Sequence, residues 1–153
     1  MSMLEDQRDL LSAFNAEGVE YMVVGGHAVN AYGVPRLTKD LDVFIHANRS
    51  NSERVFRALA RFGAPLEGIS SADFCGNPDE IFQIGVEPNR VDLLQSISGV
   101  DFESAWERRV LLEVEEGLHV SFLSLEDLLA NKRTTARLQD LADVQHLTKM
   151  NGR

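Results

Sequence analysis

The chain has 153 residues, of which 44% are hydrophobic and 25% are charged, a composition typical of an ordinary soluble globular domain. Its length leaves room for one domain, and no apolar run approaches the roughly 18 residues that a membrane-spanning helix needs. Fifteen basic residues against 24 acidic ones give a net charge of −9, which excludes a general attraction for nucleic acid but not a local basic patch. A single cysteine, Cys75, excludes an internal disulfide. Because the polar start of the chain also lacks a signal-peptide pattern, we expect a cytoplasmic protein.

Hydrophobic spacing in the first part of the chain predicts helices and strands in alternation. The predicted elements are an amphipathic helix at 3–17, a buried strand at 19–24, a short helix at 27–32, a strand of period two at 40–45 and a second long helix at 50–62. The last of these helices is predicted to begin at a capping box formed by Ser50 and Glu53.

In the second part of the chain the predicted strands come as hairpins. After an irregular loop at 66–79, the pattern predicts a hairpin at 81–94, a short helix at 102–106 and a second hairpin at 110–123. A capping box at Ser124 and Asp127 predicts the start of C-terminal helices that extend over about 124–150. This order predicts an α/β domain with a mixed sheet and excludes a doubly wound parallel sheet, which is built from βαβ units.

A glycine pair, Gly25 and Gly26, joins the predicted strand 19–24 to the short helix that follows. Glycines let the backbone approach a ligand closely, and the exposed N–H groups of such a turn can hold phosphate oxygens. The same pair also occurs in plain strand-to-helix turns, so the residues alone leave both interpretations open. His27, the next residue, is expected to cap or line the turn.

Two aspartates, Asp40 and Asp42, flank Leu41 at the start of the strand of period two. Residues at i and i+2 of a strand point to the same face, with Cα atoms about 6.6 Å apart. Two carboxylates so placed can share divalent cations, although a solvated polar face gives the same pattern. Asp92 stands alone among apolar strand residues and needs a partner, and the simple alternative to a functional role is an ion pair with Arg90 or with a neighbouring strand.

In sequence order, these features resemble the nucleotidyltransferase superfamily that includes DNA polymerase β. Its pattern is a glycine turn, an Asp-x-Asp pair about a dozen residues later, and a third acidic residue. Here Asp40 follows Gly26 by 14 positions, since 40 minus 26 is 14, and Asp92 comes later. The segment 35–42 also resembles the Arg-x-Thr-x-Asp-x-Asp motif of small bacterial members.

Residues 81–85, 89–94 and 97–100 also resemble these small bacterial members. The spacing of polar residues within 125–143 is similar to the AbiEii-like nucleotidyltransferases, whose members include abortive-infection and toxin–antitoxin toxins. The resemblance implies the nucleotidyltransferase fold, a mixed and mostly antiparallel sheet flanked by helices. It also implies that residues 1–153 form a single nucleotidyltransferase domain that ends in the C-terminal helices.

The resemblance also implies roles for individual residues. Asp40, Asp42 and Asp92 would be catalytic and would hold two Mg²⁺ or Mn²⁺ ions, with Asp92 as the candidate general base. The residues expected to bind the nucleotide are Gly25, Gly26, His27, Arg36, Thr38, Lys132, Arg137, Asp140 and Asp143. Among these, Lys132 would steady the triphosphate of the NTP substrate.

The residue pattern around Lys132 also has a simple alternative, a solvated helix surface. If one continuous helix extended through this region, Lys132 and Asp143 would share a face, about three turns apart. Arg133, Arg137 and Asp140 would then form a neighbouring row, which is also ordinary surface spacing.

The implied activity is transfer of a nucleoside monophosphate from an NTP to a hydroxyl acceptor, with release of pyrophosphate. The acceptor could be a tRNA end, a small molecule or a protein, and the protein could be the toxin of a pair with an antitoxin. Two positions depart from the family pattern, with Ala136 where glycine is expected and Gln139 where a basic residue is expected. They motivate an alternative, a non-catalytic nucleotide- or partner-binding module that keeps the fold.

Overall fold

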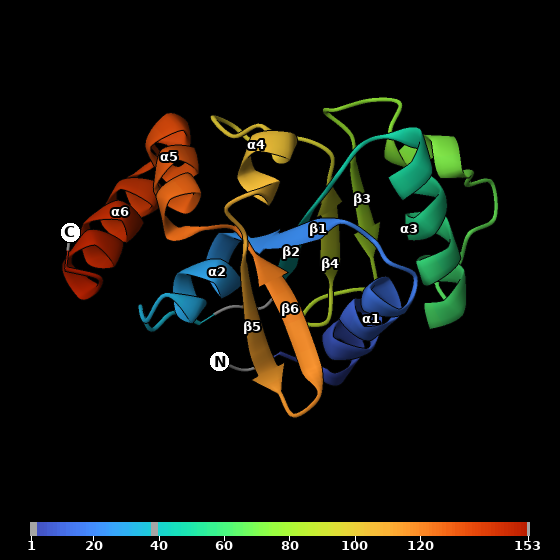
Figure 1. Cartoon of the computed structure of the whole chain (residues 1–153), viewed down its shortest axis with the longest axis horizontal. Coiled ribbons are helices and arrows are strands. Elements are labelled where there is room, and N and C mark those ends of the chain that lie inside the picture. The colour runs from blue at the N-terminus through green and yellow to red at the C-terminus, as the bar shows by residue number, and fades with distance from the viewer. Residues whose placement is uncertain (1–2, 38–39, 153) are drawn as a thin grey trace.

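The computed structural model describes residues 3–37 and 40–152, and within them six strands form one mixed sheet (Figure 1). The order across the sheet is β3 (Ile81–Ile84), β4 (Val91–Leu94), β2 (Leu41–Ile45), β1 (Tyr21–Val24), β6 (Leu118–Phe122) and β5 (Val110–Glu115). Neighbours pair antiparallel at β3–β4, β2–β1 and β6–β5, and parallel at β4–β2 and β1–β6. This mixed, mostly antiparallel sheet with flanking helices confirms the predicted fold class.

The helices gather in two groups. Helix α1 (Glu5–Ala16) packs against α3 (Arg49–Phe62), and α5 (Leu125–Thr135) packs against α6 (Leu138–Met150). In Figure 1, α3 and the α5–α6 pair lie at opposite ends of the molecule, with the short helices α2 (Gly25–Ala31) and α4 (Phe102–Trp106) between them. No helix in the described part of the chain is long and apolar enough to cross a membrane.

The core includes the central strands and the α1–α3 pair. Phe14 of α1, Leu59 of α3 and Phe44 of β2 are buried almost completely, and β1 is buried along its whole length. Each large apolar side chain removed from water contributes about 1.5–3 kcal/mol. The core therefore anchors β1 and β2, and with them the backbone at which Gly25 and Asp42 stand.

Helix α3 begins two residues before its predicted cap. Asn48 is extended, and its side chain accepts a hydrogen bond from the N–H of Asn51 at 2.7 Å. Ser50 lies inside the first turn, where its hydroxyl accepts a hydrogen bond from Arg54 at 2.7 Å. The predicted capping box at Ser50 is wrong because asparagine caps a helix as well as serine does and comes first along the chain.

Other local predictions agree more closely with the structure. Ser124 caps α5 as predicted, accepting a hydrogen bond from the N–H of Asp127 at 3.1 Å. The predicted irregular loop 66–79 contains one short 3₁₀ helix, η1 (Ser71–Phe74), whose Phe74 is fully buried. This buried ring ties the loop to the core.

The chain turns between α5 and α6 at Ala136, whose φ of +52° lies in the left-handed region. The continuous helix considered for Lys132 and Asp143 is therefore wrong. The N–H of Ala136 still donates to the carbonyl of Lys132 at 2.9 Å, and the N–H of Arg137 donates to the Asp140 carboxylate at 3.2 Å. The position at which the family pattern calls for glycine is thus the one whose backbone favours glycine.

The Ala136→Gly variant is expected to be more stable than the wild type. A left-handed residue with a Cβ costs about 1–2 kcal/mol, and the greater freedom of glycine in the unfolded chain offsets part of that gain by about 0.5–1 kcal/mol. We expect a net gain of up to about 1 kcal/mol, or roughly 2–4 °C in Tm. The matched control is Ala142→Gly inside α6, expected to lose about 1 kcal/mol. Equal losses in both variants would contradict the prediction.

Candidate functional site

Two parallel strands place Asp42 and Asp92 side by side. Asp42 is the second residue of β2, Asp92 is the second residue of β4, and the two are register partners. Because register partners in neighbouring strands project to the same face, both carboxylates lie on one side of the sheet. Asp40 lies one residue before β2. The structure thus brings together the three carboxylates that the sequence singled out.

The glycine turn lies against this cluster because β1 and β2 are antiparallel. Val24, the last residue of β1, pairs with Asp42, so α2 begins at Gly25 directly beside the Asp42 carboxylate. Gly25 has a φ of +66°, and a Cβ built on it would overlap Asp42 Oδ2 and lie 3.2 Å from Asp42 Cγ. A side chain is therefore excluded here both by the backbone conformation and by the close approach of a carboxylate.

The Gly25→Ala variant is expected to lose both stability and the geometry of the cluster. Backbone strain costs about 1–2 kcal/mol, and the new Cβ must push the Asp42 carboxylate away. The matched control is Gly63→Ala, because Gly63 has a φ of +96° with nothing within 4 Å of a built Cβ. Both variants should lose stability in denaturant unfolding, but only Gly25→Ala should also lose the nucleotide transfer that the sequence resemblance implies. Full transfer by Gly25→Ala would contradict this account.

The Arg90 guanidinium lies between two of the three carboxylates. Its Nη2 donates to Asp40 Oδ2 at 2.8 Å, and its Nε donates to Asp92 Oδ1 at 3.0 Å. The ion pair considered from the sequence as the alternative partner of Asp92 is therefore present. The second oxygen of Asp40, Oδ1, is buried and has no hydrogen-bond partner among residues 3–37 and 40–152.

Asp42 shows the electrostatic consequence of this crowding. Burial raises its pKa from 3.8 to about 6, with further increases from the charges of Asp92 and Asp40. The positive charges of Arg90 and Lys132 oppose this increase without cancelling it. The cluster therefore keeps uncompensated negative character, and a cation that reached Asp42 would stabilise it.

The donor set fits a hard divalent cation, although it is not closed around one. No three His, Cys, Asp or Glu side chains of the described residues are already arranged to hold a metal ion, and Arg90 lies between Asp40 and Asp92 instead. Carboxylate oxygens are nevertheless the ligands that Mg²⁺ and Mn²⁺ prefer. The unpartnered Oδ1 of Asp40 and the raised pKa of Asp42 both indicate coordination capacity that the protein's own groups leave unused.

His27 supports the segment in front of β2. It belongs to α2, is fully buried, and its ring hydrogen-bonds to the backbone of Asp40. Burial lowers its pKa, which favours the neutral imidazole. Its position matches the expectation that it lines the glycine turn. Thr38, also predicted to bind the nucleotide, lies outside the described residues.

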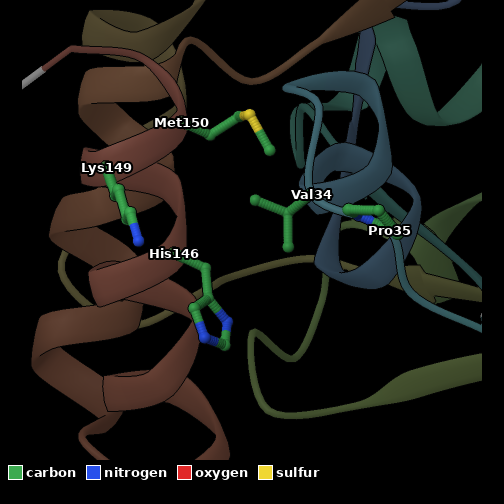
Figure 2. A pocket seen from close by; sticks show the side chains of 5 residues that line it. All are labelled: Val34, Pro35, His146, Lys149 and Met150. Carbon is green, nitrogen blue, oxygen red and sulfur yellow. The ribbon is translucent and has the colours of Figure 1, made fainter.

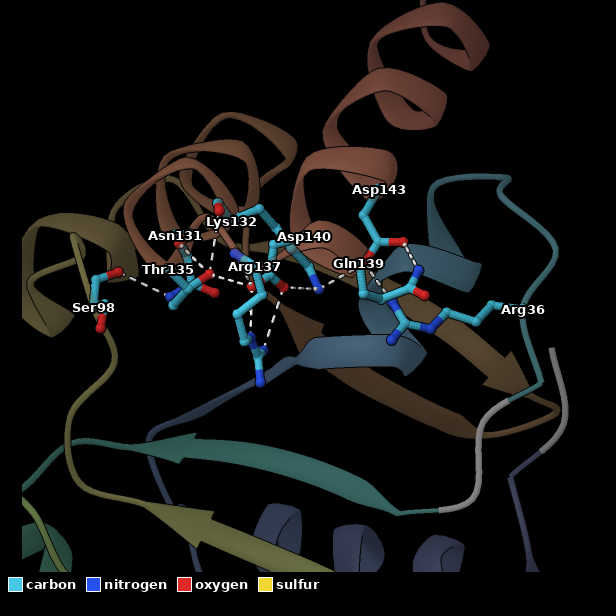
Figure 3. A network of polar contacts seen from close by, with 9 residues as sticks. All are labelled: Arg36, Ser98, Asn131, Lys132, Thr135, Arg137, Gln139, Asp140 and Asp143. Carbon is cyan, nitrogen blue, oxygen red and sulfur yellow. Dashed lines mark hydrogen bonds and ion pairs between the residues drawn. The ribbon is translucent and has the colours of Figure 1, made fainter.

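A second group of charged residues links α5, α6 and the segment after α2 (Figure 3). Lys132 is 5% exposed, and its Nζ lies 2.9 Å from Asp143 Oδ2 and 3.4 Å from Asp140 Oδ1. Arg36 forms an ion pair with Asp143 from the other side. Arg137 pairs with Asp140 at 2.7 Å, while its own side chain stays 77% exposed. The break at Ala136 thus brings Lys132 and Asp143 together by folding α6 back on α5.

Two uncharged side chains complete this network, and neither was singled out as a contact from the sequence. Thr135 Oγ1 donates to Asp140 Oδ2 at 2.8 Å, and Gln139 Nε2 donates to Asp143 Oδ1 at 2.9 Å. Gln139 therefore has a defined role at the position where the family pattern calls for a basic residue. Nothing in the local sequence pattern marks either contact, because both depend on the turn between the helices.

The network acts on the acidic cluster through the electric field of Lys132. The charge of Lys132 lowers the pKa of Asp42, so Lys132 lies within electrostatic range of the carboxylates. Arg36 stands four residues before Asp40 in the sequence and pairs with Asp143 of α6. Lys132, Asp140 and Asp143 therefore form one buried unit near the cluster, and Arg137 lies exposed at its edge.

A separate hollow lies between α6 and the segment that follows α2 (Figure 2). Val34 and Met150 face each other across it, with the basic side chains of His146 and Lys149 along α6. No predicted catalytic or nucleotide-binding residue is among the described residues that line it, which also include Pro35. This hollow is therefore distinct from the acidic cluster.

Comparison with known families and structures gives three findings. A family model described as "Nucleotidyl transferase of unknown function (DUF2204)" matches residues 3–153. No curated protein matches the chain. A presumed nucleotidyltransferase from Thermotoga maritima is similar in structure, with 16% sequence identity, a TM-score of 0.57 and coverage of 96% of this chain and 91% of that chain.

An antigenic nucleotidyltransferase-like protein from Paracoccidioides brasiliensis is also similar. Its TM-score is 0.52 at 16% identity, and the match covers 97% of this chain and 77% of that one. At such identities the likeness shows the fold alone. The family match and the shared fold confirm the predicted likeness to nucleotidyltransferases.

Proposed function

Because the chain belongs to the family described as nucleotidyl transferases of unknown function, we propose that it transfers a nucleoside monophosphate from an NTP to a hydroxyl acceptor, with release of pyrophosphate. The observation that carries this proposal is the convergence of Asp40, Asp42 and Asp92 on one face, beside the Gly25–Gly26 turn. Three crowded carboxylates next to a turn without side chains suit a reaction in which charge neutralisation and positioning supply most of the catalysis.

In this reaction the acceptor oxygen forms a bond to the α-phosphorus, and the bond from that phosphorus to pyrophosphate breaks. Asp92 is the candidate base that takes the proton of the hydroxyl. Mg²⁺ or Mn²⁺ on Asp40, Asp42 and Asp92 would supply the positive charge that neutralises the triphosphate and the developing oxyanion. The Gly25–Gly26 turn leaves room for phosphate oxygens close to Asp42.

The α5–α6 network would complete the nucleotide site. Lys132 is held by carboxylates and acts on the nucleotide through its field, which already reaches Asp42. Arg137 is largely exposed and can contact a phosphate or base directly. The same proposal assigns Arg36, Thr38, Asp140 and Asp143 to this site.

In its finer form, the proposal places the protein in the AbiEii-like branch, as a Mg²⁺-dependent toxin that acts in the cytoplasm and is held in check by an antitoxin protein. The support is the resemblance of the polar-residue spacing within 125–143 to that branch. The acceptor is a hydroxyl of a tRNA end, a small molecule or a protein.

One observation favours an alternative function, a non-catalytic nucleotide-binding module that keeps the fold. Arg90 already neutralises parts of Asp40 and Asp92, which a purely structural cluster would also require. Such a module would bind an NTP without breaking the bond between its α- and β-phosphates.

The test is incubation of the protein with each α-labelled NTP and Mg²⁺ or Mn²⁺, in the presence of total RNA, cellular protein and small molecules. We expect label in one of the three fractions and release of pyrophosphate, both lost in Asp42→Asn. The fraction that carries the label identifies the acceptor class. NTP binding without label in any fraction would support the module and overturn the transferase.

A further inference from the structure

Arg90 holds a position inside the acidic cluster that a cation could take. Its guanidinium contacts Asp40 Oδ2 at 2.8 Å and Asp92 Oδ1 at 3.0 Å. The three side chains are only partly exposed, at 27%, 23% and 13% for Arg90, Asp40 and Asp92. A charge-assisted contact of this kind is stronger than a neutral hydrogen bond. The space between Asp40 and Asp92 is therefore already neutralised by the protein itself.

The rest of the cluster lacks such a partner. Arg90 makes its hydrogen bonds to Asp40 and Asp92, and none of these bonds goes to Asp42. Oδ1 of Asp40 is buried without a hydrogen-bond partner among the described residues. The cluster thus has one part that a guanidinium occupies and one part that is free to bind a cation.

Glu87 offers Arg90 a second place outside the cluster. Arg90 Nη1 already lies 3.7 Å from Glu87 Oε1, and the Glu87 side chain is 56% exposed. A change in the side-chain torsions of Arg90 could exchange its bonds to the aspartates for a bond to Glu87 without moving β4. The guanidinium would stay paired in both positions.

We propose that Arg90 takes the place of one of the two divalent cations, so that the chain without nucleotide binds a single Mg²⁺ or Mn²⁺ ion, at Asp42 and Asp40. With an NTP bound, Arg90 turns to Glu87, and a second ion binds between Asp40 and Asp92. Arg90 is thus a positioning residue that keeps the carboxylates together and prevents full loading of the site before the substrate arrives. This inference rests on the proposed function, since it takes the carboxylates as ligands of the reaction's cations.

The experiment counts bound Mn²⁺ by electron paramagnetic resonance of the free ion, without nucleotide and with an α,β-methylene NTP that cannot be cleaved. The wild type should bind one ion without nucleotide and two with it. Arg90→Gln should bind two ions in both conditions. Without nucleotide, its affinity for the second ion should be at least about tenfold higher than that of the wild type, a factor that corresponds to about 1.4 kcal/mol. The matched control is Arg49→Gln, because Arg49 is 93% exposed and lies outside the cluster.

Glu87→Gln keeps the inference testable if Arg90→Gln does not fold. This variant removes the carboxylate to which the Arg90 guanidinium would turn. It should bind one ion without nucleotide, and its affinity for the second ion in the presence of the analogue should fall several-fold. The inference would be overturned if the nucleotide-free wild type bound two ions, or if Arg90→Gln bound one ion or none. It would also be overturned if Glu87→Gln bound the second ion with unchanged affinity. If the counts come out as expected but no NTP labels an acceptor, the inference on Arg90 stands and the proposed transfer fails.

Discussion

The Asp42→Asn variant is expected to lose nucleotidyl transfer while its fold survives. Asp42 lies between the glycine turn and Asp92, and its carboxylate is the member of the cluster that Arg90 does not pair. Loss of one charged ligand removes several kcal/mol of transition-state stabilisation, and each 1.36 kcal/mol is a factor of ten in rate. We therefore expect at least about a thousandfold loss of transfer.

The same substitution is expected to stabilise the protein without metal at neutral pH. The pKa of Asp42 is about 6 in the folded state against an ordinary 3.8, so the folded state binds the proton more tightly. The stabilisation from this proton is complete below about pH 3.8 and is lost as the pH rises through 6. At pH 8 the ionised Asp42 costs the wild type up to about 3 kcal/mol, which the asparagine avoids.

Thermal melting in EDTA at pH 8 and at pH 4, beside the transfer assay, checks both parts. Asp42→Asn should melt above the wild type at pH 8, and the difference should vanish near pH 4. Asp79→Asn, a substitution on an exposed loop, serves as the control and should leave both melting and transfer unchanged. An Asp42→Asn variant that melts well below the wild type, or that transfers at the wild-type rate, would refute the assignment.

The Lys132→Met variant is expected to have the largest effect on stability. Its removal leaves the carboxylates of Asp140 and Asp143, each 2% exposed, without their shared buried cation. Breaking a buried ion pair from one side costs about 3–5 kcal/mol, a large share of the roughly 5–15 kcal/mol that stabilises a typical domain. Lys149→Met is the matched control, because Lys149 is exposed on α6, and it should change stability by less than about 0.5 kcal/mol.

The loss in Lys132→Met should depend on pH in a defined direction. Burial acts to raise the pKa values of Asp140 and Asp143, but their hydrogen bonds and the charge of Lys132 outweigh it and lower both. Groups with lowered pKa values contribute stability above their ordinary pKa, and this stability is lost as the pH falls through the folded value. In denaturant unfolding, the difference in the free energy of unfolding between wild type and variant should be largest near pH 7 and should decrease below about pH 4. A difference that is small at pH 7 would show that the network contributes little.

Features set by neighbouring residues could be predicted from the sequence. The helix at 102–106 has the predicted bounds, the strand of period two begins at Leu41, one residue after its predicted start at Asp40, and Ser124 caps α5 as expected. Such signals are local, because side-chain alternation and caps depend on a few adjacent residues. The predicted cap of α3 was wrong because Asn48 and Ser50 are both good capping residues, and the local sequence does not favour one over the other.

The candidate site needed contacts that no local pattern encodes. Asp42 and Asp92 are neighbours because β2 and β4 pair in parallel, whereas the local residue pattern suggests only that each lies on a strand. Lys132 and Asp143 meet because the backbone turns at Ala136. An alanine does not by itself predict such a turn. The sequence by itself therefore determined which residues are the candidates for the chemistry and on which elements they are expected. Only the tertiary structure decided that Arg90 occupies the acidic cluster and that Lys132 is buried between two carboxylates, because both depend on strand register and helix packing between distant segments.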